Sequence, residues 1–83
     1  MTQTLPDILG TRDWQDIAAL QPAVAGRMIL VQAKSGQFNH IFFGGAAAPG
    51  ARDGQMLPGG ESFAGEADHV WVRGNARFSV TIL

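Results

Sequence analysis

The sequence of 83 residues contains no cysteine, which excludes disulfides and thiolate metal sites and leaves the redox compartment open. Positive charge is also scarce, because Lys34 and five arginines are scattered along a chain of net charge −1. This dispersal gives no electrostatic footprint for nucleic acid. No apolar run approaches membrane-spanning length, and the N-terminus lacks the charged start and apolar stretch of a signal peptide. We therefore expect a protein made in the cytoplasm that binds neither nucleic acid nor membrane, although later assembly into an extracellular particle stays open.

The small size of the chain predicts that it needs support from other molecules. A domain of this length buries about 60% of the surface that its unfolded chain exposes, so it is marginally stable alone. Small scaffolds usually add disulfides, a metal or partner subunits. Because disulfides are excluded, oligomerisation or docking on a larger body is the expected supplement.

What the sequence does have is turns and short alternating segments. Eleven glycines and four prolines indicate many turns. Near the C-terminus, Phe78, Val80 and Ile82 alternate with polar residues, which is typical of a half-buried strand. Val70 and Val72 could face the same core from the segment 69–73. With Gly74-Asn75 as the turn, the pattern predicts a hairpin of strands 69–73 and 77–83.

Segments 28–34 and 39–43 flank a turn at residues 35–37 and predict a second hairpin. Ile29, Val31 and Ala33 share one face of the first strand, and its other face is also fairly apolar, which favours a central position in the sheet. Residues 44–60 form a long loop in which Met56 and Leu57 are a possible short strand, and residues 61–64 predict another strand.

The N-terminal third is less clear. Residues 1–13 look like an arm that is either frayed or ordered by a neighbouring subunit. Residues 14–20 fit a helix, with Asp13 as N-cap and Pro22 as the stop, or an edge strand, which we favour because the rest of the chain is β. The expected fold class is all-β: a small antiparallel β-sandwich or jelly-roll-like barrel, with an extended N-terminal arm (1–13) and a single domain (14–83).

No pattern of residues in the sequence indicates a catalytic site. Ser35 and Ser79 have no sequence relation to His40 or His69, so a nucleophile–base pair is not expected. A metal site of His40, His69 and Glu61 would need them to meet in the fold, and the clustered spacing of a cupin site is missing. The paired glycines are turn glycines without the residues of a phosphate loop. We expect no catalytic, metal or cofactor site, and no enzyme activity.

Several runs resemble a group of small structural proteins of tailed bacteriophages. They are the strand Met-Ile-Leu-Val-Gln at 28–32, a Gly-Gly-Ala-Ala-Ala-Pro stretch at 44–49, a Pro-Gly-Gly-Glu turn at 58–61, Val-Trp-Val-Arg-Gly at 70–74 and Ala-Arg-Phe-Ser-Val-Thr at 76–81. The chain departs from that pattern with Ala33 where Asn is common and with a more aromatic segment 38–43. The resemblance covers about residues 14–83, and its motifs are structural rather than catalytic. It implies a virion component of small β-sandwich form, of the kind that decorates or cements capsids, often as a trimer.

The sequence therefore favours a capsid decoration protein. It would be a homo-oligomer, by the resemblance a trimer, bound to the major capsid protein on the outer surface of the virion. The alternative is a tail- or fibre-associated module that recognises a receptor or glycan, with an exposed tryptophan as stacking platform. The residues expected at interfaces are the apolar ones of the arm and loop, the two tryptophans and one arginine: Leu5, Ile8, Leu9, Trp14, Met56, Leu57, Trp71 and Arg73.

Overall fold

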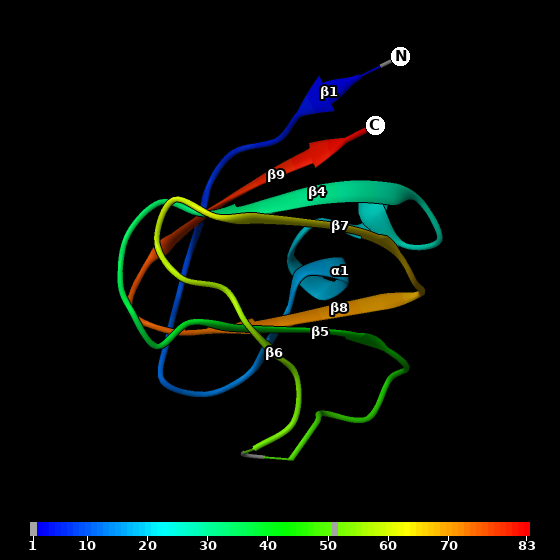
Figure 1. The fold of residues 1–83 in the computed structure, drawn as a ribbon. Helices are drawn as coiled ribbons and strands as arrows, with labels where there is room; N and C mark the ends of the chain where they lie inside the picture. The colour runs from blue at the N-terminus through cyan, green and yellow to red at the C-terminus, as the bar shows by residue number, and fades with distance from the viewer. Residues whose placement is uncertain (1, 51) are drawn as a thin grey trace.

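The computed structural model describes residues 2–50 and 52–83, and it consists of two antiparallel sheets packed face to face (Figure 1). The all-β sandwich expected from the sequence is confirmed, and it is not closed into a barrel. The elements in chain order are β1 (Gln3–Thr4), β2 (Ile8–Leu9), β3 (Gln15–Asp16), α1 (Ile17–Leu20), the 3₁₀ turn η1 (Pro22–Val24), β4 (Met28–Ala33), β5 (His40–Gly44), β6 (Gln55–Met56), β7 (Ser62–Glu66), β8 (His69–Arg73) and β9 (Arg77–Ile82).

The first sheet, sheet A, has the order β1-β9-β4-β7, with β2 also paired to β9. The second, sheet B, has the order β3-β8-β5-β6. In sheet A, Val31 of β4 lies opposite Val80 of β9 and Phe63 of β7, so β4 is central, as its two apolar faces predicted. In sheet B, Ile41 of β5 lies opposite Val72 of β8.

The core lies between the inner faces of the two sheets and follows the alternation seen in the sequence. Ile29, Val31 and Ala33 are fully buried, and so are Phe78 and Val80. Successive side chains on a strand point to opposite faces, which is why the polar residues between them face solvent. The predicted faces of both strands, and the inward direction of Val70 and Val72, are therefore confirmed.

Both predicted hairpins are wrong. Strand β8 pairs with β5 and β3, whereas β9 pairs with β4, β1 and β2, so the turn at Gly74 carries the chain from one sheet to the other. In the same way β4 belongs to sheet A and β5 to sheet B. The physical reason is packing: Gly74 has φ +137° and lies so close to Asn39 that a Cβ would stand 2.7 Å from the Asn39 Cα. The chain thus crosses from one sheet to the other at Gly74 and does not form a two-residue hairpin turn there; we call this crossing the corner.

Residues 3–10 of the arm run along β9 of the same chain. Gln3 and Thr4 lie opposite Ile82 and Thr81, and Ile8 lies opposite Phe78. Two backbone hydrogen bonds add to this pairing, from the Leu5 N–H to the Val80 oxygen (2.9 Å) and from the Gly10 N–H to the Ala76 oxygen (2.7 Å). The segment therefore completes one edge of sheet A.

The ambiguous segment 14–20 contains both alternatives. Gln15–Asp16 form β3 at the edge of sheet B, and Ile17–Leu20 form the single helical turn α1. The N-cap is Asp16 and not Asp13, because the Asp16 Oδ1 accepts a hydrogen bond from the Ala18 N–H at 2.9 Å. Pro22 follows the helix and begins η1. The favoured strand thus holds only for Gln15 and Asp16.

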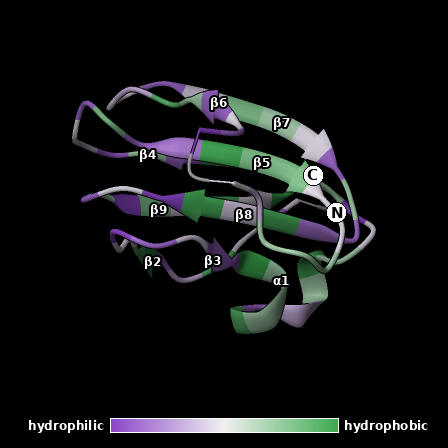
Figure 2. Ribbon diagram, turned by 90° about the horizontal axis from the view of Figure 1, so that it is seen from below, coloured by the Kyte–Doolittle hydropathy of each residue, from purple (hydrophilic) through white to green (hydrophobic). Residues whose placement is uncertain are grey.

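The two long sides of the sandwich differ. On one side α1 lies along the opening between the sheets (Figures 1 and 2). Ile17 of α1 and Val24 of η1 are fully buried. On the other side lie β6 and β7, and no described helix covers that side (Figure 2). We call it the open side. Within residues 2–50 and 52–83, no helix combines the length and hydrophobicity needed to cross a bilayer.

Candidate functional site

The outer face of sheet B carries most of the aromatic and basic side chains of that sheet. The alternation that buries Ile41, Val70 and Val72 sends the intervening residues outward. Pairing then places Phe42 opposite Trp71, and His40 opposite both Arg73 and Met56. An aromatic outer face is unusual for a sheet exposed to water, so this face is the first candidate for a binding surface.

Both tryptophans hold the long loop against this face. The Trp14 indole N–H donates to the Gly50 carbonyl at 3.1 Å, and the Trp71 indole N–H donates to the Gly45 carbonyl at 3.0 Å. Gly54 also approaches Trp14 closely, since a Cβ on it would stand 2.9 Å from the indole ring. Both indoles are half-buried. Their first role is therefore to fasten the loop, which sequence reasoning did not predict.

A second role of Trp14 is to order a neighbouring arginine and histidine. The Arg73 guanidinium carbon lies 5.1 Å from the centre of the Trp14 ring, within the range of a cation–π contact. The His40 ring meets Trp14 edge-on, with the ring centres 6.5 Å apart. The His40 Nδ1 lies 3.1 Å from the Phe38 carbonyl, and because a carbonyl can only accept, Nδ1 carries the proton.

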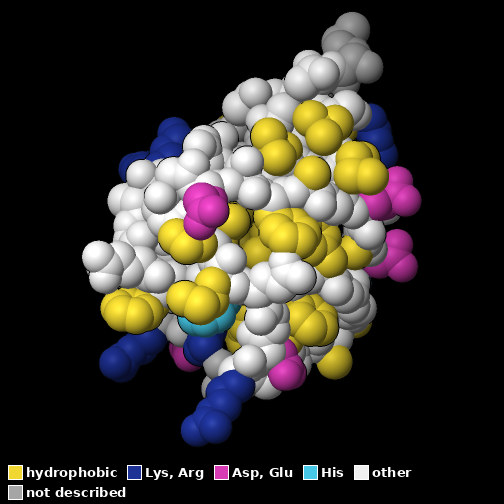
Figure 3. Space-filling view, viewed as in Figure 1, with side chains coloured by type: hydrophobic (Ala, Val, Ile, Leu, Met, Phe, Trp, Pro, Cys, Tyr) yellow, Lys and Arg dark blue, Asp and Glu magenta, His cyan; other side chains and the backbone are white. Residues whose placement is uncertain are grey.

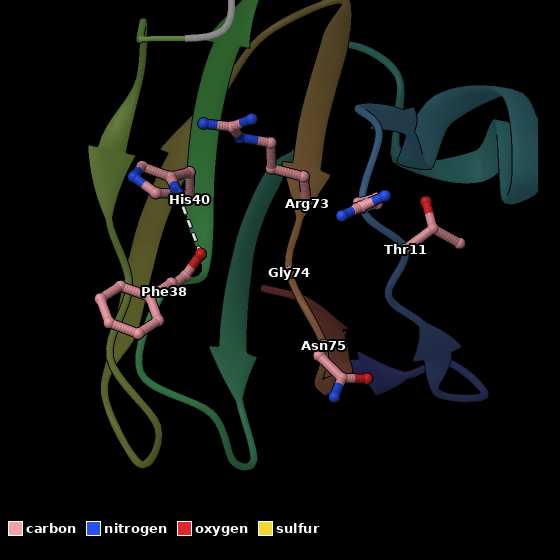
Figure 4. Close-up of a pocket in the computed structure, with 7 residues that line it drawn as sticks. Thr11, Phe38, His40, Arg73, Gly74 and Asn75 are labelled. Atoms are coloured by element: carbon pink, nitrogen blue, oxygen red, sulfur yellow. Dashed lines mark hydrogen bonds between the residues drawn. The ribbon is translucent and has the colours of Figure 1, made fainter.

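Next to this stack lies a pocket of about 500 Å³, which we call the basic pocket. Its walls come from three segments far apart in the sequence: Thr11 and Arg12 before β3, Phe38 and His40 at the start of β5, and Arg73, Gly74 and Asn75 at the end of β8. In Figure 4, Phe38 and His40 line one wall, Thr11 lies on the other, and Arg73 stands between them. Two guanidinium groups therefore share one hollow, and none of the described residues that line it carries a carboxylate.

The walls of the basic pocket are fastened to one another. The Gly74 N–H donates to the Thr11 carbonyl at 2.8 Å, which ties the arm to the end of β8. Behind Gly74, the fully buried Asn39 donates from Nδ2 to the Ser35 carbonyl (2.6 Å) and to the Leu57 carbonyl (3.3 Å). A pocket whose walls are already bonded loses little order on binding. Thr11, Arg12 and Asn75 were not among the residues predicted for a site, because the arm has no pattern that indicates which of its residues return to the sheet.

A second hollow, of about 460 Å³, lies on the open side; we call it the apolar cleft. It is lined by Ile41, Phe42, Phe43, Gly54, Gln55 and Phe63. Phe43 of sheet B and Phe63 of sheet A meet across it with ring centres 5.7 Å apart. The Phe43 ring fits because Gly65 has no side chain, since a Cβ there would stand 2.6 Å from it. Figure 3 shows hydrophobic side chains gathered on this side of the molecule, between the two sheets.

The strand edges that flank the apolar cleft are incompletely paired in the described part of the chain. Strand β7 is the last strand of sheet A on this side. Strand β6 pairs with β5 only at His40 and Ile41, so β5 continues beyond it from Phe42 to Gly44. Such edges present backbone donors and acceptors that can pair with another strand.

The residues expected at interfaces are thus divided by the fold. Ile8 and Leu57 are 5% and 2% exposed and belong to the protein's own core, so neither is available as a surface contact. Leu9 and Met56 are well exposed, and Leu5, Trp14, Trp71 and Arg73 are half-buried. Sequence reasoning missed Phe38, which is the most exposed large hydrophobic side chain described, at 76%.

The weighed metal site does not assemble among the described residues. They contain no group of three His, Asp or Glu side chains able to hold a metal ion. His69 instead bonds through Nδ1 to the Asp16 Oδ2 at 2.6 Å, and the other oxygen of that carboxylate caps α1. This pair links β8 to the start of the helix and has a structural role.

Comparisons with protein-family models, with curated proteins and with solved structures found no match to this chain.

Proposed function

We propose that this protein is a bacteriophage virion component, a capsid decoration protein that binds the major capsid protein as a homo-oligomer. The sequence motifs that resemble small phage structural proteins support a role in the virion and, by the same resemblance, a trimeric state. Its mechanism is attachment: buried apolar area and strand pairing clamp neighbouring capsomers together.

The observation that carries the proposal is the open side of the sandwich. Phe43 and Phe63 are half-buried there beside strand edges that the described residues pair incompletely. A lone soluble domain usually covers or charges such an edge, because an uncovered edge promotes association. A partner strand laid along β5 or β7 would pair the edge and place its side chains on the apolar cleft. This is how a small, marginally stable domain gains stability from a larger body.

The first test is the copy number of this chain relative to the major capsid protein, measured by quantitative mass spectrometry of purified particles. We expect a count close to that of the capsid protein. A few copies per particle would overturn decoration and would favour a place in the tail or a fibre. No copies at all would overturn any virion role.

The second test asks whether the open side is the contact. Gln55→Arg places a long charged side chain at the mouth of the apolar cleft, and Gln37→Arg makes the same change at an exposed position outside it. Binding to particles stripped of this chain should fall by at least tenfold for Gln55→Arg and stay unchanged for Gln37→Arg. Equal binding by both variants would remove the apolar cleft from the proposal.

The exposed Leu9 offers a separate test of the arm. It lies on β2 beside the buried Ile8, so it can be changed without opening the core. If the arm contributes to shell binding, Leu9→Lys weakens attachment while the unfolding curve stays at its wild-type position. Undiminished attachment would leave the arm a purely internal part of sheet A.

A further inference from the structure

We propose that the basic pocket binds an anionic sugar, a hexose-sized ring that carries one carboxylate or phosphate group. This inference rests on the pocket alone and is independent of attachment to a capsid. The volume of about 500 Å³ lies within the range of small-molecule sites, roughly 300–1,000 Å³, and is far larger than a lone carboxylate requires.

The basic side chains that line the pocket favour an anionic ligand. Arg12 and Arg73 both line it, and they are two of only six basic Lys and Arg side chains in a chain of net charge −1. Guanidinium groups bind carboxylate and phosphate oxygens through paired N–H donors. Trp14 lies beneath the Arg73 guanidinium and limits where it can point. A positive pocket on a weakly negative protein is selective for the sign of its ligand.

The remaining lining groups suit hydroxyls and the face of a ring. The His40 Nδ1 is bonded to the Phe38 carbonyl, so Nε2 is the ring nitrogen left to bond a sugar hydroxyl. Asn75 supplies an amide that both donates and accepts, and the Thr11 hydroxyl, which donates to the Asp13 carbonyl at 2.9 Å, can still accept. Phe38, exposed at the rim, offers an apolar surface to the C–H face of a sugar ring. An acidic side chain of a protein would use the arginines and leave these groups unused.

The test is a titration of the isolated protein with probes that separate these features, followed by ¹H–¹⁵N NMR and calorimetry. Glucuronate and glucose 6-phosphate combine a hexose ring with an anion. Glucose has the ring alone, acetate has the anion alone, and a tetraglutamate peptide has several carboxylates without a ring. We expect at least one of the two anionic sugars to shift the amide signals of Arg12, His40, Gly74 and Asn75. Glucose and acetate should bind at least tenfold more weakly.

The matched variants are Arg12→Gln, which removes a pocket charge, and Arg27→Gln, which removes an exposed charge outside the pocket. Arg12→Gln loses one charge-assisted contact and should weaken the affinity for the anionic sugar by about tenfold or more. Arg27→Gln should leave that affinity unchanged. The proposal is overturned if neither anionic sugar binds, if glucose or acetate binds equally well, or if both variants behave alike. Tighter binding of tetraglutamate than of both sugars would also overturn it and would identify a protein contact.

Discussion

The packing of the arm against the core can be tested with two adjacent side chains. Ile8 is 5% exposed and lies opposite the fully buried Phe78, whereas Leu9 is 66% exposed. Replacing a buried isoleucine by alanine costs about 2–5 kcal/mol in unfolding free energy. We expect a loss near the lower end of this range, about 2–3 kcal/mol, because β2 has two residues at a sheet edge and can move inward to fill part of the cavity. The Leu9→Ala variant should lose less than about 0.5 kcal/mol.

The assay is urea unfolding followed by the fluorescence of Trp14 and Trp71, with thermal unfolding as a second measurement. For a domain of this size, the Ile8→Ala loss corresponds to a fall in Tm of roughly 10–20 °C. If Ile8→Ala unfolds within 0.5 kcal/mol of the wild type, residue 8 is not part of the core and the segment is a loose arm. If Leu9→Ala costs about 2–3 kcal/mol and Ile8→Ala almost nothing, the register of β2 against β9 is wrong by one residue, because a one-residue shift exchanges the two faces.

Three further substitutions test the corner, the loop and the helix cap. Gly74→Ala should lower the free energy of unfolding by about 2 kcal/mol or more, because φ is +137° and a Cβ would collide with Asn39. Gly45→Ala, with open space around it, should cost little, and equal losses in chemical unfolding would contradict the corner geometry. Trp71→Phe removes the hydrogen bond from the indole to the Gly45 carbonyl of the loop, at a cost of about 1 kcal/mol. Trypsin should then cut faster after Arg52, and an unchanged cleavage rate would show that this bond does not restrain the loop. Asp16→Ala removes both the capping oxygen and the oxygen that bonds His69, so it should cost at least about 1 kcal/mol. Asp16→Asn keeps an oxygen for the cap and should cost less, and equal thermal shifts would argue against the cap.

Sequence patterns predicted what depends on neighbouring residues. The buried faces of 28–33 and 77–82 follow from a period of two, and β6 and β7 were expected within one or two residues of their positions. Strand partners were not predictable in this way. A glycine turn between two alternating segments looks the same whether the segments pair or enter different sheets, and here the outcome depends on the distant Asn39 packing against Gly74.

The candidate sites were predictable only in part for the same reason. Trp14 and Arg73 were expected at an interface, and the fold brings them together with His40 beside the basic pocket. Arg12 reaches that pocket because the arm pairs with β9, which no local pattern indicates. Ile8 and Leu57 were expected at the surface because an apolar residue in an irregular segment does not reveal whether it faces a partner or its own core.

The crossing of the chain between sheets has a consequence for its synthesis. Strand β8 lies inside sheet B and β9 lies inside sheet A, so residues 69–82 supply an interior strand to each sheet. Until both strands have left the ribosome, β3 is separated from β5 and β4 lacks a partner on one side. Among the strands of residues 2–50 and 52–83, only β5 and β6 are neighbours both in the chain order and in a sheet. Before residues 69–82 are synthesised, only the β4–β7 and β5–β6 pairs can form and neither sheet can be completed, so the apolar faces of these strands are expected to stay exposed to chaperones and proteases until then.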